Sequence, residues 1–336
     1  MPWADTLKAL GMLCIYIGHF GPVSGKLYSF VFLFHVPLFF FISGFFHSNK
    51  SSVVEFSINR FKKIVVPYLI FSVLSLFFFS LRAPEYVKDI SYTVQAIAFG
   101  VRNTTYYAEG LWFLPCLFIM SLVFRLLSSI TNRVFLLSAL LSVSCLVIFP
   151  NMPSSDPRLW FNIDSAMQYI IYYACGFSFR QHVGLYIKDD KPTNIFSVVV
   201  FISLLLIAFI YTKGTSFITL AIGKFALLNY LTSVSITLVA IILCIFIALH
   251  LSHLNLINNI GKGSIILCGT ENICRGILIT AISTMGLSVK FSNPLSIVLL
   301  SITVMMISRL VFFPVFHSLI VQPTKTVPAL GEKRPL

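Results

Sequence analysis

Charged side chains are scarce in this sequence, and acidic ones are the scarcest. Charged residues make up 10% of the 336 residues, with 24 Lys and Arg against 11 Asp and Glu. Soluble domains carry about 25% charged residues, so this composition excludes an ordinary soluble fold. Hydrophobic residues reach 57%, and the mean hydropathy is +0.92. The sequence therefore predicts an all-α bundle of transmembrane helices that crosses a lipid bilayer many times.

Motifs for several common chemistries are also missing. The sequence contains no GxSxG, P-loop or dinucleotide fingerprint. Its seven cysteines lie in apolar segments without a CxxC pair, which indicates small buried hydrophobes rather than a disulfide framework. His250 and His253 are close in sequence but have no third ligand nearby, so we expect no metal. We expect no permanently bound cofactor either, and any chemistry must come from polar residues within the spans.

Ten apolar segments are long enough to cross a hydrocarbon layer about 30 Å thick. They are residues 6–22, 28–46, 64–81, 111–128, 134–150, 164–180, 195–212, 226–250, 264–283 and 294–316. The inner loops hold more Lys and Arg than the outer loops when both termini are cytoplasmic, which favours that orientation. The same rule accounts for the net charge of +13 without nucleic acid. We expect one membrane domain, residues 1–320, and a short cytoplasmic tail, residues 321–336.

The first span contains two ionisable residues whose spacing places them on the same face of a helix. Lys8 and His19 are eleven residues apart, which on a helix is three turns plus about 20°. Both therefore project from one face, separated by about 16 Å along the axis. Asp5, one turn before Lys8, is placed to pair with it. Because ionisable groups are expensive in hydrocarbon, this polar stripe predicts a functional site that faces the protein interior or a wet cavity.

A second histidine, His35, lies at the start of HVPLFFFISG in the second span. Only a short GPVSGK turn separates the first two spans, so we expect His19 and His35 toward the same, outer face of the membrane. Pro37 follows two residues later. Its missing N–H leaves backbone carbonyls free and predicts a local kink beside a cavity.

Five motifs occur in order along the chain: DTLKALGMLCIYIGH, FHVPLFFFISGFF, RFKKIVVPYLIF, GLWFLPCLF and GKGSIILCGT. Together they resemble the integral-membrane acyltransferase family 3, in particular its branch of sugar O-acetylases similar to fucose 4-O-acetylases. The resemblance runs from residue 3 to about 120 and resumes at 261–270. It implies an enzyme that takes an acyl group, usually acetyl from cytoplasmic acetyl-CoA. The acceptor it implies is a hydroxyl of a surface glycan or its lipid-linked precursor, at the inner membrane of a bacterium.

Acyl transfer to a hydroxyl needs a base that removes the proton or a nucleophile that carries the acyl group. Neutral imidazole can do either near pH 7, and the family pattern also places its histidine at His19. We therefore expect His19 to be catalytic; the alternative interpretation is a histidine packed at a helix end. His35 is expected to orient the acceptor hydroxyl or share the proton, with simple snorkelling at the interface as its alternative.

On the donor side, Lys8 occupies the arginine-or-lysine position of the family motif, which implies a place near the phosphates or the thioester of coenzyme A. Arg60, Lys62 and Lys63 precede VVPYL on a predicted inner loop. Arg binds phosphate with a planar fork and Lys as a point charge, so this group suits the coenzyme A phosphates. The positive-inside rule alone also predicts basic residues here. The expected donor-binding residues are therefore Asp5, Lys8, Arg60, Lys62 and Lys63.

On the acceptor side, the loop before the fourth span reads TTYYAEGLWFLP. Its aromatic rings suit the apolar faces of sugars, and its carboxylate suits hydroxyl groups. The expected acceptor-binding residues are Tyr106, Tyr107, Glu109 and Trp112. An ordinary aromatic belt at the membrane interface explains the rings equally well.

The ninth span contains two further ionisable residues, Glu271 and Arg275, which are one helical turn apart and predict an internal ion pair. The sequence departs from the family at this point. The resemblance implies a histidine near the GT of this segment, whereas CGTE supplies Glu271 instead.

These observations predict a multi-pass inner-membrane O-acetyltransferase that uses acetyl-CoA as co-substrate and acts on a bacterial surface polysaccharide such as an O-antigen. Two alternatives remain open. A transporter of a small anion or an acylated sugar would use Lys8 and His19 as a relay. A non-catalytic scaffold in an envelope-polymer complex would be insensitive to changes at His19. The concentration of polar groups in the first two spans favours the enzyme.

Overall fold

The structure is a computed structural model that describes residues 1–336 apart from 83–88, 105, 149–158, 189–190, 214–225, 287–292 and 321–336. The side chains of residues 106, 107, 109, 208–213, 226 and 318–320 are also outside the description. The chain is 87% helical, which confirms the all-α prediction. Among the described residues the β structure is one hairpin of two-residue strands, β1 (Ile187–Lys188) and β2 (Lys191–Pro192). The predicted cytoplasmic tail lies outside the described residues.

Each of the ten predicted spans coincides with helical structure. In chain order these helices are α1 (Pro2–Gly18), α2 (Lys26–Phe32) with α3 (His35–Phe45), α5 (Val66–Arg82), α7 (Phe113–Ile130), α8 (Val134–Ile148), α9 (Ile163–Tyr186), α10 (Asn194–Lys213), α12 (Ala226–Leu251), α14 (Ser264–Thr284) and α15 (Pro294–Val311). In the described part of the chain, six helical segments are long and apolar enough to cross a membrane. The chain is therefore a multi-pass membrane protein, while the count of ten spans and the side of each terminus stay predictions.

Several shorter helical segments join these helices and were not expected from the hydropathy pattern. They are α4 (Val53–Arg60), α6 (Ile90–Phe99), α13 (Asn255–Lys262) and α16 (Phe313–Ile320), with the 3₁₀ segments η1 (Gly21–Ser24), η4 (Tyr106–Trp112) and η5 (Trp160–Asn162) and the π-helical segment η2 (Phe61–Val65). A search for long apolar runs does not detect segments this short, or segments as polar as α13. One of them, η4, contributes to the site described below.

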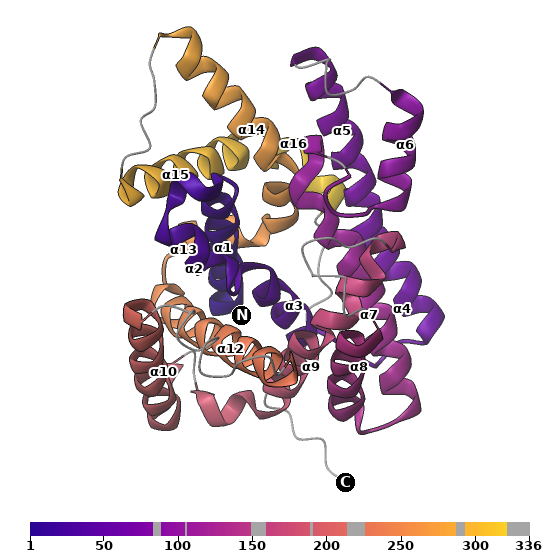
Figure 1. Cartoon of the computed structure of the whole chain (residues 1–336), viewed down its shortest axis with the longest axis vertical. Coiled ribbons are helices and arrows are strands. Elements are labelled where there is room, and N and C mark those ends of the chain that lie inside the picture. Colours follow the sequence, from indigo (N-terminus) through magenta and orange to yellow (C-terminus); the bar gives the residue numbers. More distant parts are fainter. Residues whose placement is uncertain are drawn as a thin grey trace.

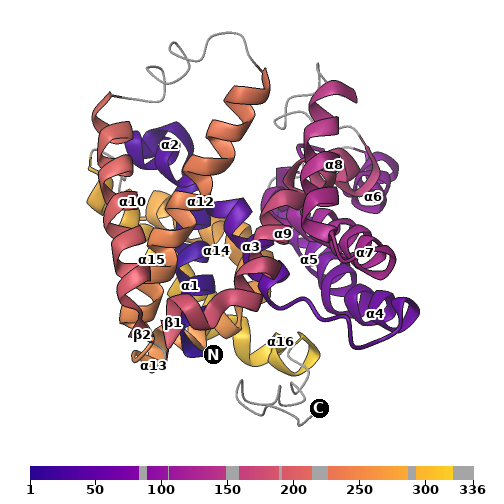
Figure 2. The ribbon, with the colours of Figure 1, turned by 90° about the horizontal axis from the view of Figure 1, so that it is seen from below.

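The helix α1 lies at the centre of the molecule. It packs against α2, α3, α12, α13, α14 and α15 (Figure 1). Seen from below, α4 to α9 gather on one side and α1, α2, α10 and α12 to α15 on the other, with α3 between them (Figure 2). The polar residues of α1 are therefore turned toward other helices of the protein.

Close backbone contact fixes α1 against α13. A Cβ atom at Gly261 would lie 1.7 Å from the carbonyl oxygen of Asp5, so no side chain fits there. The Thr6 hydroxyl also donates a 2.5 Å hydrogen bond to the Asn258 side chain of α13. This contact gives the GKGS sequence a physical reason, because its first glycine lets the two backbones meet.

The second span is broken in its middle. The seven-residue helix α2 precedes His35, and α3 begins at His35; the membrane side of this residue stays a prediction. Pro37 cannot donate to the carbonyl of Leu33; the Thr237 hydroxyl of α12 donates to that carbonyl instead, at 2.8 Å. The kink expected from Pro37 is present, and a neighbouring helix satisfies the freed carbonyl as required in a bilayer.

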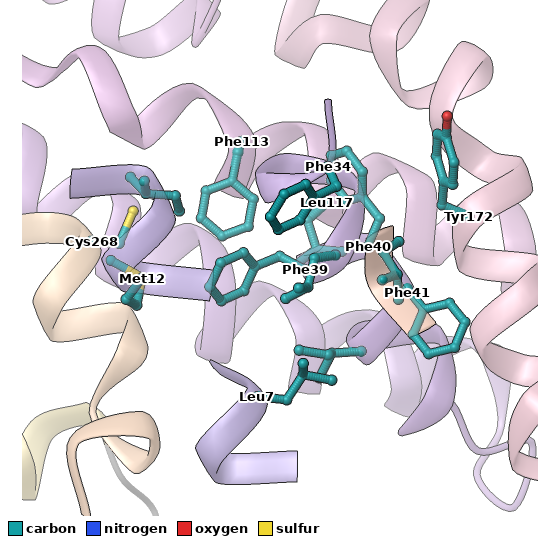
Figure 3. Close-up of a cluster of buried hydrophobic side chains, with 14 of the residues drawn as sticks. Leu7, Met12, Phe34, Phe39, Phe40, Phe41, Phe113, Leu117, Tyr172 and Cys268 are labelled. Carbon is teal, nitrogen blue, oxygen red and sulfur yellow. The ribbon is translucent and has the colours of Figure 1, made fainter. Parts of the chain in front are cut away.

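The helices α3 and α9 also pack backbone to backbone. A Cβ atom at Gly44 would lie 1.9 Å from the carbonyl oxygen of Tyr173, and one at Gly176 would lie 1.9 Å from the carbonyl oxygen of Phe41. Around this contact the core is rich in phenylalanine. Figure 3 shows Phe34, Phe39, Phe40 and Phe113 gathered with Met12 and Leu117. Rigid packing of this kind holds α3 in place between the two sides of the molecule.

Candidate active site

His19 lies at the C-terminal end of α1 rather than within it. Its backbone N–H still bonds to the carbonyl of Ile15 at 3.0 Å, and the helix ends one residue earlier, at Gly18. The chain then turns at Gly21, which has a φ of 68°, and Pro22 follows. The predicted span ended later because hydropathy alone does not register this glycine and proline turn.

The imidazole of His19 meets a buried carboxylate from α14. Its Nδ1 lies 2.7 Å from Oε2 of Glu271, whose side chain is 4% exposed. The helix α14 packs against α1 and also against α5, where Gly269 leaves room for the ring of Phe71. Residues 252 positions apart in the sequence thus form a direct polar contact.

A guanidinium group holds the other side of the carboxylate. Arg275 Nε lies 3.1 Å from Oε1 of Glu271, so each carboxylate oxygen has a cationic or N–H partner. Arg275 also donates through Nη1 to the backbone carbonyl of His19 and through Nη2 to Asn272, at 2.6 Å for the latter. Arg275 therefore contacts both ends of the His19–Glu271 pair and fixes their relative position.

This arrangement decides which nitrogen of His19 is available. A carboxylate only accepts hydrogen bonds, so Nδ1 of His19 carries a proton and donates it to Glu271. In the neutral ring Nε2 then holds a free lone pair. An imidazole with one nitrogen tied to a carboxylate and the other free is the arrangement of a general base or a nucleophile.

The free side of the His19 ring points toward the segment η4. A Cβ atom at Gly110 would lie 3.0 Å from Cε1 of His19 and 3.8 Å from Nε2. The carbonyl of Gly110 in turn accepts from Cys268 Sγ of α14, at 3.6 Å. The loop predicted to hold the acceptor therefore passes directly beside the His19 ring, and the glycine at this point leaves room next to Nε2.

Of the four predicted acceptor residues, the structure places one. Trp112 is half-buried and lies under the guanidinium of Arg102, whose Cζ is 4.5 Å from the ring centroid. The side chains of Tyr106, Tyr107 and Glu109 lie outside the described residues, although their backbone belongs to η4. Asn162, with a φ of 53°, donates to the carbonyls of Gly100 and Trp112 and so ties η4 to the start of α9.

His35 is buried at the start of α3. Its Nδ1 lies 2.7 Å from the carbonyl oxygen of Val31, so the ring donates through Nδ1 and keeps Nε2 free, as in His19. The ring of Phe32 packs edge-on against it, with centroids 4.7 Å apart. His19 is one of its electrostatic neighbours, and the structure thus brings the two histidines near each other.

The predicted donor residues separate into two places. Lys8 Nζ donates to Asp5 at 2.7 Å, and it lies 5.8 Å from the centroid of the Phe46 ring. Lys62 and Lys63 are exposed on η2. Arg60 instead lies over the ring of Phe56, at 5.1 Å, and faces the interior of the loop that follows α3.

That loop contains a polar cluster that the sequence did not reveal. His47 is buried; its Nδ1 lies 2.9 Å from the hydroxyl of Tyr173 and its Nε2 lies 2.8 Å from Oδ1 of Asn49. Because the amide oxygen of Asn49 accepts, Nε2 carries a proton, and in the neutral ring Nδ1 accepts from the Tyr173 hydroxyl. Burial lowers the pKa of His47 to about 4. Nearby guanidinium groups, from Arg60, Arg125 and Arg180, act in the same direction.

The face of α1 between Lys8 and His19 is filled by apolar side chains. Met12 is fully buried and Ile15 is 6% exposed. Figure 3 shows Met12 beside Cys268 and the ring of Phe39. A substrate arm that runs along this face from Lys8 to His19 therefore requires Met12 to move, and a methionine is the side chain best able to do so.

The structure thus places a buried carboxylate beside a histidine within a bundle of helices long enough to cross a membrane. A family model described as an acyltransferase domain, acyltransferase family 3, matches residues 1–317. The chain belongs to this family and is a membrane acyltransferase, which decides against the transporter and scaffold hypotheses. No curated protein and no solved structure matches the chain.

Proposed function

We propose that this acyltransferase is an O-acetyltransferase of the sugar O-acetylase branch. It takes acetyl from acetyl-CoA and transfers it to a hydroxyl of a bacterial surface polysaccharide, or of its lipid-linked precursor, at the inner membrane. The observation that carries the proposal is the 2.7 Å contact between His19 Nδ1 and Glu271, which leaves Nε2 free beside Gly110. A hydroxyl acceptor needs such a base, whereas a thiol or amine acceptor needs it less.

In the direct form of the reaction, Nε2 of His19 removes the proton of the acceptor hydroxyl while the oxygen attacks the thioester carbonyl carbon. The new C–O bond forms, the C–S bond breaks, and the thiolate of coenzyme A takes the proton from the imidazolium. Glu271 stabilises the imidazolium through Nδ1 and does not itself give up or take a proton. In the stepwise form Nε2 first carries the acetyl group and then passes it to the hydroxyl.

The remaining residues take roles on either side of His19. Lys8, Asp5, Arg60, Lys62 and Lys63 serve the donor. The segment η4, with Tyr106, Tyr107, Glu109 and Trp112, serves the acceptor. This assignment is supported by the position of Gly110 of η4 against the His19 ring and by that of Lys8 on α1, three helical turns before His19. His35 holds or shares the proton of the acceptor hydroxyl.

The test removes the imidazole. His19→Ala should abolish acetyl transfer, measured as the acetyl content of the surface glycan by mass spectrometry, while the protein still accumulates in the membrane. His250→Ala, the same change at an exposed histidine of α12, is the matched control and should leave the acetyl content unchanged. Wild-type acetylation by the His19 variant would remove this residue from the mechanism. Acetyl trapped on a His19 peptide would select the stepwise form.

A further inference from the structure

Three arginines from three different helices converge on the loop of residues 46–52, between α3 and α4. Arg180 of α9 donates to the carbonyls of Phe45 and His47, at 3.3 and 3.1 Å. Arg125 of α7 donates to the carbonyl of Ser51 at 2.7 Å. Arg60 of α4 completes the group, and all three act electrostatically on His47. We call these three residues the arginine cluster.

No carboxylate in the described part of the chain forms an ion pair with the arginine cluster. Among the described residues, ion pairs join Asp5 with Lys8 and Glu271 with both His19 and Arg275, and none includes the cluster. The end of α3 supplies at most about half an elementary negative charge, and His47 is neutral. Within the part of the chain that the structure describes, these three guanidinium charges therefore have no full compensating charge.

The cluster also has unused hydrogen-bond donors. Arg125 is 7% exposed, and its Nε is buried without an acceptor. The guanidinium of Arg60 has a ring contact with Phe56, which uses none of its five N–H groups. A buried charge and unused donors are costly unless something satisfies them. Arg60 and Arg180 are half-buried, so a ligand can reach them from the surface while Arg125 adds charge from beneath.

We propose that the arginine cluster binds a phosphate group of the nucleotide part of the acyl donor, with Arg60 and Arg180 in contact with the phosphate. The inference rests on the proposed use of acetyl-CoA and adds Arg125, Arg180 and the loop of residues 46–52 to its site. Planar guanidinium forks suit phosphate oxygens. The cluster lies at the Lys8 end of α1, since the ring of Phe46 is 5.8 Å from Lys8 Nζ. The donor would thus extend from this loop past Lys8 toward His19.

The first experiment measures binding without catalysis. Adenosine 3′,5′-bisphosphate, the phosphate-bearing end of coenzyme A, is titrated into the purified full chain in detergent while the midpoint of thermal unfolding is followed. We expect stabilisation of the wild type and an affinity weakened about tenfold or more in Arg180→Gln and in Arg60→Gln, as for loss of one charged hydrogen bond. Arg133→Gln, an exposed arginine beyond the end of α7, is the charge-matched control. Equal affinity in all four proteins overturns the proposal.

A second measurement needs no variant and so does not depend on folding of a mutant. Phenylglyoxal modifies accessible arginines, and peptide mapping locates them. Adenosine 3′,5′-bisphosphate should protect Arg60 and Arg180 in the wild type and leave Arg133 reactive. Protection of none of them would end the idea.

A lipid headgroup is the other source of phosphate, and nanodiscs separate the two. Suppose that phosphatidylglycerol stabilises the wild type more than phosphatidylcholine does, that this difference disappears in Arg180→Gln, and that the nucleotide has no effect. The arginine cluster then binds lipid, and the proposed donor site is overturned. The His19→Ala protein should still bind the nucleotide. Normal acetylation by that variant together with intact nucleotide binding would refute the proposed chemistry at His19 and leave the phosphate site standing.

Discussion

His19 and His47 are both part of the polar interior, at opposite ends of α1, and their neighbours differ in sign. His19 faces a buried carboxylate at 2.7 Å. His47 faces a tyrosine hydroxyl, an amide oxygen and three guanidinium groups. A carboxylate stabilises an imidazolium, whereas guanidinium groups oppose it. In the proposed mechanism, the same side chain thus serves proton transfer beside a carboxylate and neutral hydrogen bonding beside guanidinium groups.

The largest effect should follow from removing the negative charge beside His19. In Glu271→Gln the amide cannot stabilise the imidazolium and can donate to Nδ1, which favours the wrong tautomer of the ring. We expect kcat for acetyl transfer to fall by about 10²- to 10⁴-fold, the usual contribution of general acid–base catalysis, with a much smaller change in the KM for acetyl-CoA.

The matched control for this change is Glu55→Gln, the same substitution at an exposed glutamate in the first turn of α4. It should leave kcat within about twofold. A Glu271→Gln enzyme with wild-type kcat would show that His19 does not need its carboxylate partner. The different neighbours of His19 and His47 would then not explain their different roles.

The next effect concerns stability and pH at His47. The pKa of His47 is about 4 in the folded protein, below the value of about 6.5 in an unfolded chain. Between these values the unfolded chain binds a proton that the folded protein does not. The stabilisation is therefore complete above about pH 6.5 and is lost as the pH falls toward 4, on the order of 3 kcal/mol in all.

Thermal unfolding of the detergent-purified protein between pH 8 and 4 measures this effect. The midpoint of the wild type should fall more steeply below pH 6.5 than that of His47→Gln, which keeps a polar group but has no titration. His182→Gln, at an exposed histidine of α9, should follow the wild type. If the unfolding midpoints of the wild type and His47→Gln fell in parallel with pH, protonation of His47 would not destabilise the folded protein.

The smallest effect tests the space beside the His19 ring. In Gly110→Ala the new methyl group would lie 3.0 Å from Cε1 of His19, close enough to displace the ring or the acceptor. We expect kcat/KM to fall about tenfold, since small displacements of reacting groups are costly. Gly184→Ala, where no atom lies within 4 Å of the added carbon, should have no effect. An unchanged Gly110→Ala enzyme would place the acceptor elsewhere.

Much of the fold could be predicted from the sequence, because long apolar runs dominate it. Each predicted span coincides with helical structure, and Pro37 correctly indicated the kink in the second span. The division of this span into two separate helices, α2 and α3, was not predicted. The residues around it, FVFLF, are apolar on both sides, so hydropathy gives no sign of where a helix stops and the next begins.

The candidate site could be predicted only where local spacing carries the information. Spacing within one helix indicated the pairing of Asp5 with Lys8 and of Glu271 with Arg275, and both contacts are present. The contact between His19 and Glu271 joins α1 to α14, and nothing local to either residue encodes it. The same holds for His47, whose polar partners include Tyr173 from α9 and arginines from three helices. Its one sequence signal was the polar run HSNK directly after an apolar span.

The central position of α1 has a consequence for how the protein is made. At about 5–20 residues per second, the 252 residues between His19 and Glu271 take roughly 10 to 50 s to synthesise. During that time the first helix has none of the later helices, α12 to α15, that will surround it. Lys8 and His19 must then be sheltered by the insertion machinery, because bare ionisable groups are costly in lipid. A fragment whose synthesis stops after α10 lacks Glu271. By the proposed mechanism, such a fragment has no acyltransferase activity.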